Sequence, residues 1–455
     1  MKKMLATLLS GAMVLSLAAC GNNGSGGAAS TPESSSAGSS SPSTESVEDV
    51  KTPTGPVTLN VTTTFAGEDT NAANYQDAIA AWQKETGNKL NDASGSSTET
   101  FKARIISDFE MGSESDVLFY FNGVDSNPFV EAGKVVSIDE IRQTYPDYAS
   151  NMKDGMLGAS PLDGKNYSIP MNGYWEGMFV NKAVCEAANV EIPGPATTWD
   201  EFLETCQKIK DAGYTPIAAS FAEIPHYWFE FCIYNYLTPA THNIVPASVA
   251  DKHGTAWVDG IEDMKLLYEY GFLPENTLSA TDGETFQLFI DGKAAFLIDG
   301  SWKVGGIEGA TDDIDNFTVT YVPGKNDRLT TDIIGGLSSG WYITRKAWDD
   351  PEKRQACVDF ISYMTSDEMV TQFASVSATA LKNGSQVDES QLSSLAVAGL
   401  ELVKGATGMS AAVQDQVTQE ARVPVFNGMP DIVTGKADIK EAVEELLKLV
   451  AEGQQ

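Results

Sequence analysis

The residue with the clearest potential to bind a ligand is Trp302, because of the segment that precedes it. Trp302 follows the turn Asp299 to Ser301, and that turn follows the wholly apolar run Ala294 to Ile298. A short apolar run bounded by turns predicts a strand that is covered on both faces. Trp302 would then lie at the carboxyl end of a strand, where open α/β sheets place their ligands. The spacing alone leaves a core tryptophan under a loop as an equal alternative.

Strands and helices are expected to alternate before this stretch. Val57 to Thr63 alternates apolar and polar residues, Tyr75 to Glu85 has apolar residues at helical spacing, and Asp116 to Phe121 contains another short apolar run. Strand, helix and strand at this spacing predict crossover units and a largely parallel sheet. The roughly 400 residues from Pro56 onward are enough for two domains with substantial cores.

The amino end has the pattern of a targeting segment. Two lysines, an apolar run that ends at Leu17 and small residues before Cys20 predict a signal peptide over residues 1–19. Residues 17–20 resemble a bacterial lipobox, which implies that Cys20 is lipidated and becomes the first mature residue. Residues 20–55 are dominated by Ser, Gly, Thr and Pro, so we expect a flexible tether there. No later stretch is apolar enough to span a membrane, so the lipid would be the membrane anchor.

The composition argues against several classes of function. The formal net charge of −33 would repel nucleic acid and provides no basic patch for anionic lipid, so a neutral or cationic small ligand fits better. With three histidines and no CxxC pair, we expect no metal site, and we expect no cofactor. The other cysteines lie in apolar, helix-like surroundings, where buried thiols are favoured and disulfides are the alternative: Cys185, Cys206, Cys232 and Cys357.

Six short motifs, taken in order, resemble the extracellular solute-binding proteins of carbohydrate ABC importers, the family that includes maltose-binding protein. The resemblance covers nearly all of the chain from Val57 to Val450. The motifs are Tyr167-Ser168-Ile169-Pro170, Phe179-Val180-Asn181-Lys182, Thr198-Trp199-Asp200-Glu201, Phe289-Ile290-Asp291-Gly292-Lys293-Ala294-Ala295-Phe296, Asp299-Gly300-Ser301-Trp302 and Gly340-Trp341-Tyr342-Ile343.

This resemblance implies an α/β fold of the two-lobed, periplasmic-binding-protein-like type II class, with hinge-connected lobes and a ligand site in the cleft between them. Lobe one would hold residues 56–168 and 321–369, and lobe two would hold residues 169–320 and 370–455. The boundary near Ile169 would be a hinge strand, in which Pro170 removes one amide donor and constrains the residue before it.

The resemblance also implies which residues bind the solute. A sugar offers a face of C–H groups and a rim of hydroxyls, so its receptor needs aromatic plates and polar side chains at their edges. Tyr174 and Trp175 are neighbours on an extended strand and point oppositely, so one of them should face the cleft, and the sequence leaves open which. The expected site comprises Trp302, Trp228, Tyr227, Tyr174, Trp175, Glu68, Asp69, Tyr120, Asn122, Asp299, Gly336 and Ser338.

The function implied by the resemblance is binding without chemistry. A monomeric protein, lipid-anchored at the extracellular face of the cytoplasmic membrane, would close on a sugar or oligosaccharide and deliver it to an ABC permease. A receptor for a peptide or polyamine, and a surface adhesin or sensor built on the same fold, are alternatives. An enzyme is a further alternative: a lipid-anchored glycoside hydrolase would need two carboxylates about 5 to 9.5 Å apart. No Walker A, HExxH or GxSxG motif supports an enzyme.

Overall fold

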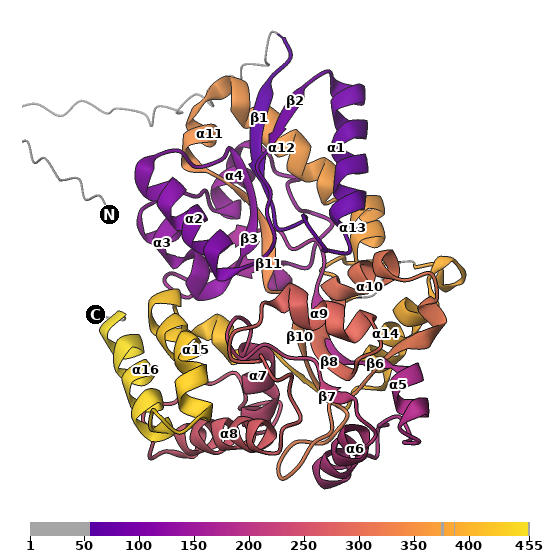
Figure 1. The fold of residues 1–455 in the computed structure, drawn as a ribbon. Helices are drawn as coiled ribbons and strands as arrows, with labels where there is room; N and C mark the ends of the chain where they lie inside the picture. Colours follow the sequence, from indigo (N-terminus) through magenta and orange to yellow (C-terminus); the bar gives the residue numbers. More distant parts are fainter. Residues whose placement is uncertain (1–54, 375–376, 386, 454–455) are drawn as a thin grey trace, which may run out of the picture. The chain divides into compact units, whose positions relative to one another are not determined.

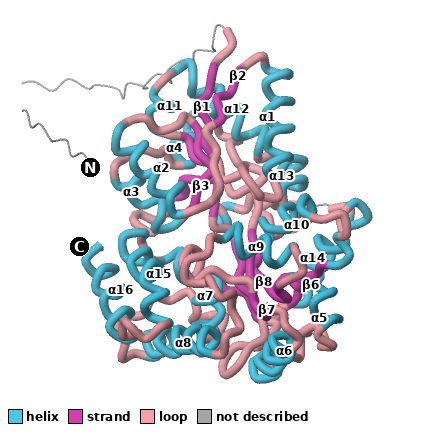
Figure 2. The backbone as a smooth tube through the Cα atoms, viewed as in Figure 1, coloured by secondary structure: helices cyan, strands magenta, loops and turns pink. Residues whose placement is uncertain are grey.

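Two β-sheets organise the chain, and each is covered by helices (Figures 1 and 2). The computed structural model describes residues 55–374, 377–385 and 387–453, so the expected signal peptide, Cys20 and nearly all of the expected tether lie outside the described residues. We call the elements around the four-stranded sheet lobe one and those around the six-stranded sheet lobe two. None of the helices in this described part of the chain is long and apolar enough to cross a membrane.

Lobe one is built on the strand order β11-β3-β1-β2. β1 runs parallel to β2 and β3, as the crossover pattern predicts, whereas β11 is antiparallel to β3. Its elements are β1 (Thr58–Thr62), α1 (Ala72–Thr86), β2 (Lys89–Asp92), α2 (Glu99–Met111), β3 (Val117–Phe121), α3 (Asn127–Glu131), α4 (Ile138–Thr144), β4 (Gly158–Ala159), β5 (Asn166–Ser168), β11 (Ser339–Ile343), α11 (Arg345–Asp349), α12 (Pro351–Met364) and α13 (Asp367–Phe373).

Lobe two is built on the strand order β12-β10-β6-β8-β7, with β9 also paired to β6. Its elements are β6 (Tyr174–Asn181), α5 (Lys182–Ala187), α6 (Trp199–Asp211), β7 (Thr215–Ile217), α7 (His226–Tyr234), α8 (Lys252–Glu269), α9 (Asp282–Ile290), β8 (Ala294–Gly300), α10 (Val304–Ala310), β9 (Phe317–Thr320), β10 (Asp332–Gly336), α14 (Ser394–Gly405), β12 (Gly408–Ser410), α15 (Gln419–Val433) and α16 (Ile439–Gly453).

The central strands of lobe two are covered on both faces. Every residue of β6 and β8 is buried, which confirms the strand predicted from the apolar run Ala294 to Ile298. Side chains alternate across β6, so Met178 packs into the core beneath α7 and α8, whereas Phe179 packs into a separate core with α9 and α14. This alternation decides which residues at the start of β6 can face a ligand.

The sheet membership corrects two of the expected lobe boundaries. β10 pairs with β6, so the chain returns to lobe one at Ser339 rather than at residue 321. Val370 and Leu381 pack into the core of lobe one, so the second boundary falls after Leu381 rather than at residue 369. Pairing between strands far apart in sequence sets the first position, packing into the core of lobe one sets the second, and no local pattern marks either. Ile169, at the expected hinge, pairs through its backbone with Trp341.

The cysteines of the described part of the chain are free and buried, as predicted: Cys185, Cys206, Cys232 and Cys357. Burial raises the pKa of the Cys185 thiol to about 11, so this thiol stays protonated near neutral pH. These side chains therefore act as small apolar groups in the cores of the two lobes.

Candidate functional site

A cavity of about 1140 Å³ is lined by residues of both lobes. Lobe one contributes the loop after β1, the loop before α2 with the start of that helix, and the end of β3. Lobe two contributes the start of β6, the turn after β8, and residues around the beginning of α7, α9 and α15. The carboxyl ends of β1, β3 and β8 all open onto this space, which is the usual position of a ligand in an α/β sheet.

Aromatic side chains form a continuous wall on the lobe-two side of the cavity. The ring centroid of Trp302 lies 6.0 Å from that of Tyr174 and 6.0 Å from that of Tyr227. Tyr227 lies 4.3 Å from His226, and His226 lies 5.8 Å from Phe426, again between ring centroids. All five side chains line the cavity, although they come from four different elements. Such a wall offers an extended apolar surface of the kind that stacks on a flat ligand face.

The indole of Trp302 is positioned by its local backbone and by lobe one. Gly300 ends β8, and a Cβ atom at this position would collide with the Trp302 ring, so the indole folds back over a site that only glycine leaves open. The hydroxyl of Thr70, in lobe one, donates to the carbonyl of Trp302 at 2.9 Å. Trp302 therefore lies where the two lobes meet.

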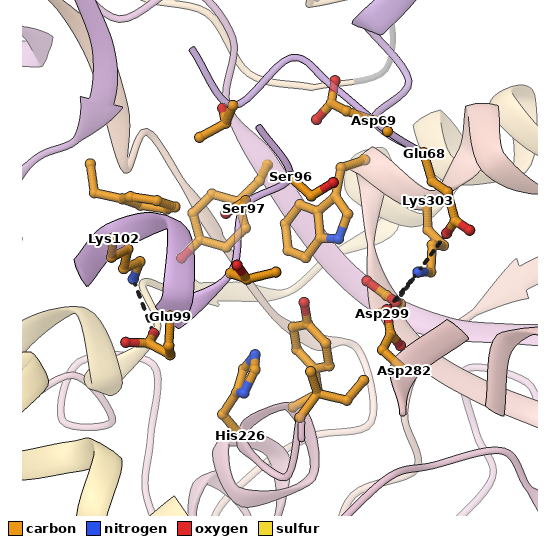
Figure 3. A pocket seen from close by; sticks show the side chains of 18 of the residues that line it. Glu68, Asp69, Ser96, Ser97, Glu99, Lys102, His226, Asp282, Asp299 and Lys303 are labelled. Atoms are coloured by element: carbon orange, nitrogen blue, oxygen red, sulfur yellow. Dashed lines mark hydrogen bonds and ion pairs between the residues drawn. The ribbon is translucent and has the colours of Figure 1, made fainter. Parts of the chain in front are cut away.

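Charged side chains form two groups on opposite sides of the pocket (Figure 3). In the first group, the Lys303 Nζ lies 3.0 Å from the Asp282 carboxylate, 3.2 Å from that of Glu68 and 3.6 Å from that of Asp299. Burial opposes the charge on Lys303, but these carboxylates outweigh it and raise its pKa above the ordinary value. Burial raises the pKa of Asp299 to about 6, against the opposing effect of Lys303. Because Glu68 belongs to lobe one, this group joins the two lobes.

The second group also joins the lobes. Arg422, on α15, pairs with Asp125 at 3.0 Å and with Glu99 at 3.2 Å, and both acids belong to lobe one. Lys102 donates to Asp125 at 2.8 Å and lies 4.1 Å from the centroid of the Phe121 ring. Burial alone would raise the pKa of Asp125, but Lys102 and Arg422 hold it below its usual range. Asp125 is therefore a charged link between the lobes.

A buried row of three polar side chains supports the loop beside the wall. His242 lies 3.0 Å from the Glu230 carboxylate through Nε2 and 3.1 Å from the Ser410 hydroxyl through Nδ1. Glu230 in turn accepts from the backbone amides of Val413 and Gln414. These three residue types can act in catalysis, but here they are fully or almost fully buried and do not line the cavity. The row fixes the position of the loop that contributes Gln414 and Asp415 to the cavity.

The structure brings together many of the residues expected at the site. Asp69, in the loop after β1, is one of them, and burial raises its pKa to about 7 although the amide of Asn71 opposes this. Tyr174 rather than Trp175 faces the cavity, which answers the alternative that the sequence left open. The expected residues that line the cavity are Trp302, Tyr227, Tyr174, Glu68, Asp69, Asp299 and Ser338.

Other expected residues do not line the cavity. Trp175 packs on the opposite face of β6, where its ring contacts the core. Trp228 follows Tyr227 on α7 and points into the core, stacked at 6.4 Å on Phe202. Tyr120, fully buried on β3, packs against the ring of Phe129.

Two further expected residues also have structural surroundings. The side chain of Asn122 accepts a hydrogen bond from the Tyr342 hydroxyl at 2.9 Å, which fastens the loop after β3 to β11. Gly336 ends β10 and pairs with Tyr174 through the backbone rather than opening onto the cavity. Both positions follow from strand pairings that the sequence pattern does not reveal.

Several cavity residues were missed by the sequence analysis. Glu176 could have been found, because it lies two residues after Tyr174 and alternation on a strand puts both on one face. Lys303 could also have been found, because it directly follows Trp302 in the sequence. The others come from distant segments that only the fold brings together: Glu99, Lys102, Asp282, Asp415 and Phe426.

Comparison with known proteins places the chain in a family. Residues 77–390 match the family described as bacterial extracellular solute-binding protein, and the chain belongs to that family. The predicted two-lobed α/β fold is confirmed by solved structures: a chitin oligosaccharide binding protein has a TM-score of 0.75 at 20% identity, covering 87% of this chain and 98% of that one. A structure of RafE in complex with raffinose has a TM-score of 0.65 at 18% identity, covering 88% of this chain and all of that one.

Two curated relatives are similar in sequence. A multiple sugar-binding protein of Streptococcus mutans is 23% identical over 283 residues, which cover 60% of this chain and 63% of the relative. The sn-glycerol-3-phosphate-binding periplasmic protein UgpB of Rhizobium meliloti is 22% identical over 299 residues, which cover 62% of this chain and 65% of the relative. The match thus spans just under two thirds of the length of these relatives, which are binding proteins by name.

Proposed function

We propose that this protein is the substrate-binding lipoprotein of an ABC importer, and that it binds a sugar or oligosaccharide in the cavity between its lobes and delivers it to a membrane permease. The observation that carries the proposal is the aromatic wall of Tyr174, Trp302 and Tyr227 in a cavity rimmed by carboxylates. Flat apolar surfaces with polar edges complement a sugar ring. The names of the Streptococcus mutans relative and of the chitin oligosaccharide binding protein support the same class of ligand.

The energetics are sufficient for such a receptor. Burial of about 100 Å² of a sugar face on an indole contributes roughly 2 to 3 kcal/mol. Hydrogen bonds from sugar hydroxyls to charged groups add about 1.5 to 3 kcal/mol each. After the cost of association, two stacking contacts and several hydrogen bonds give a dissociation constant on the order of micromolar. A cavity of about 1140 Å³ has room for more than one sugar ring.

Binding would proceed by closure of the lobes around the solute. Ion pairs from Lys303 to Glu68 and from Arg422 to Asp125 connect the lobes on both sides of the cavity. The permease would recognise this closed form, and neither closure nor recognition requires the bound ligand to react. We therefore propose a transport receptor rather than an enzyme. The proposal includes a monomer that is held at the extracellular face of the membrane through a lipid on Cys20.

An anionic solute such as a glycerol phosphate fits this cavity less well. Both lysines that line it are already paired with carboxylates. The carboxyl groups at its surface outnumber these lysines, and those that are ionised would repel a phosphate: Glu68, Asp69, Glu99, Glu176, Glu223, Asp282, Asp299 and Asp415.

A thermal-shift screen of the full chain against monosaccharides, oligosaccharides, glycerol phosphates, polyamines and peptides tests the proposal, with product analysis of every hit. We expect one set of sugars to raise the melting temperature without being cleaved. Stabilisation by polyamines or peptides alone would contradict the sugar ligand. Cleavage of a bound sugar would contradict the transport receptor.

A further inference from the structure

Glu176 differs from the other carboxyl groups around the cavity. It lies on β6, between β8 and β10, and only 2% of its surface is exposed, yet it lines the cavity. Its Oε2 atom is buried and has no hydrogen-bond partner among the described residues. A buried polar atom without a partner has lost its hydrogen bonds to water, which is unfavourable in free energy. A ligand group that pairs with this atom would offset a large part of that desolvation free energy.

The groups that act on Glu176 from neighbouring elements are acidic. Burial and the carboxyls of Glu230, Asp415 and Asp299 together raise the pKa of Glu176 well above its ordinary value. Glu230, from α7, is paired with His242, and Asp299, from β8, lies 3.6 Å from Lys303. Glu230 and Asp299 are thus partnered by other side chains and not by Glu176.

Aromatic rings complete the surroundings of this carboxyl group. Tyr174 lies on the same face of β6 as Glu176, and its ring contacts that of Trp302, which in turn contacts Tyr227. A carboxylate beside aromatic faces is the combination that recognises an ammonium group, because the ring faces and the carboxylate both attract positive charge. A neutral hydroxyl could also pair with Oε2, but it would gain neither the charge attraction of a carboxylate nor that of the ring faces.

We propose that the solute is an amino sugar or an oligosaccharide that contains one, and that its protonated amine binds beside Glu176 against the rings of Tyr174 and Trp302. This inference rests on the proposed sugar-binding function and narrows the class of sugar. Burial and the neighbouring acids raise the pKa of Glu176 and so favour its protonated form. An ammonium group favours the carboxylate, so binding releases that proton to the solvent while the ligand keeps its charge.

Calorimetry with matched sugars tests the inference. The probes are glucosamine, galactosamine and their oligomers, each compared with its N-acetylated form of equal length, at a pH where the free amine is protonated. We expect the amines to bind at least tenfold more tightly, with a heat that depends on the ionisation enthalpy of the buffer because a proton is released. Equal or tighter binding of N-acetylated or other neutral sugars would overturn this inference but leave the proposed function intact. Stabilisation by no sugar at all would overturn both.

The substitution Glu176→Gln separates charge recognition from shape. Glutamine keeps the size of the side chain and its capacity to donate and accept a hydrogen bond, so binding of a neutral sugar should change little. Binding of the amino sugar should weaken at least tenfold, and the buffer dependence of the heat should disappear. Glu262→Gln, an exposed residue of α8, makes the same change of charge away from the cavity and serves as the control. Retention of wild-type affinity for the amino sugar by Glu176→Gln would overturn the assignment.

Discussion

The position of one indole at the cavity depends on one glycine. Because Gly300 has no Cβ, the ring of Trp302 folds back against the end of β8 and contacts Tyr174 and Tyr227. The same ring is only partly buried and packs at the edge of the lobe-two core rather than inside it. Its removal should therefore affect ligand affinity much more than the cooperativity of unfolding.

Replacement of Trp302 by alanine should weaken sugar binding at least tenfold, since an indole face contributes roughly 2 to 3 kcal/mol of stacking. Calorimetric titration of the sugar identified by the thermal-shift screen measures this loss. Tyr270→Ala removes a half-exposed ring that does not line the cavity and should bind as the wild type does. Unchanged affinity of Trp302→Ala in a cooperatively folded protein would remove the indole from the site.

At the level of single residues, local patterns predicted the site only in part. Trp302 follows the end of β8 and lines the cavity, and this position could be inferred because strand, turn and aromatic are adjacent in sequence. The sequence could not show which of Tyr174 and Trp175 faces the cavity, because that depends on which face of β6 meets it. Trp228 was misplaced, since a helix as apolar as α7 shows no polar face from which to infer its outer side.

At the level of elements, the start of α10 packs closely against the loop after β1. The amide of Gly305 donates to the Thr70 hydroxyl at 2.8 Å, and that hydroxyl donates to the carbonyl of Trp302. A Cβ at Gly305 would lie 2.7 Å from the Cα of Thr70, too close for unchanged packing. The two lobes can therefore approach this closely only with glycine at that position.

The substitution Gly305→Ala should disfavour the closed arrangement, because the new methyl group meets the backbone of lobe one. We expect ligand affinity to fall by roughly tenfold, equivalent to about 1.4 kcal/mol, and the radius of gyration in the presence of ligand to increase. Titration calorimetry and small-angle X-ray scattering measure the two effects.

Gly309→Ala provides the matched control for this element. It lies on the same helix, and a Cβ there meets no atom within 4 Å beyond its chain neighbours and the backbone of its own helix. It should leave affinity and dimensions unchanged. Equal ligand affinity and equal radius of gyration in the two variants would show that close packing at Gly305 does not limit closure.

Elements were predictable where their signals are local. The buried strand at residues 294–300, and the capping box of Thr198 and Glu201 that begins α6, are encoded within a few residues. The placement of β10 in lobe two was not predictable in this way, because it depends on pairing with β6 more than 150 residues earlier, as between Ile334 and Glu176.

For the whole molecule, buried acids should make stability depend on pH. The native pKa values of Asp69, Asp299 and Asp415 are raised to about 7, 6 and 6, in each case mainly by burial. Unfolded carboxyls lose their protons near pH 4. Between these values the three carboxyls bind more protons in the native state than in the unfolded chain, so they make the free energy of unfolding fall as the pH rises.

The ligand-free protein should therefore melt at a lower temperature at pH 7.5 than at pH 5, as measured by differential scanning calorimetry. Asp69→Asn should raise the melting temperature at pH 7.5 and reduce this slope, since the amide keeps an acceptor for Asn71 without a buried charge. Asp163→Asn should leave the slope unchanged, because the amide of Lys165 holds the pKa of this exposed acid below its usual range. Stability that rises between pH 5 and 7.5 would contradict the prediction.

Attachment to the membrane is a further prediction for the whole molecule. Cys20→Ser removes the thiol that the proposed lipid would modify, so the protein should move from the membrane fraction into the medium. Fractionation of cells and immunoblotting measure this release. Persistent sedimentation of the variant with membranes would exclude the lipid on Cys20 as the anchor.

The discontinuous lobes also have a consequence for how the chain folds. β3 receives its second neighbour only when β11 pairs with it, and the Tyr342 hydroxyl reaches Asn122 from 220 residues further along the chain. Such non-local pairing is slow to form. During synthesis from the amino end, β3 therefore remains an edge strand of the lobe-one sheet until the chain has been made through Ile343. A protein that must cross a membrane before it folds would gain time for export from this delay.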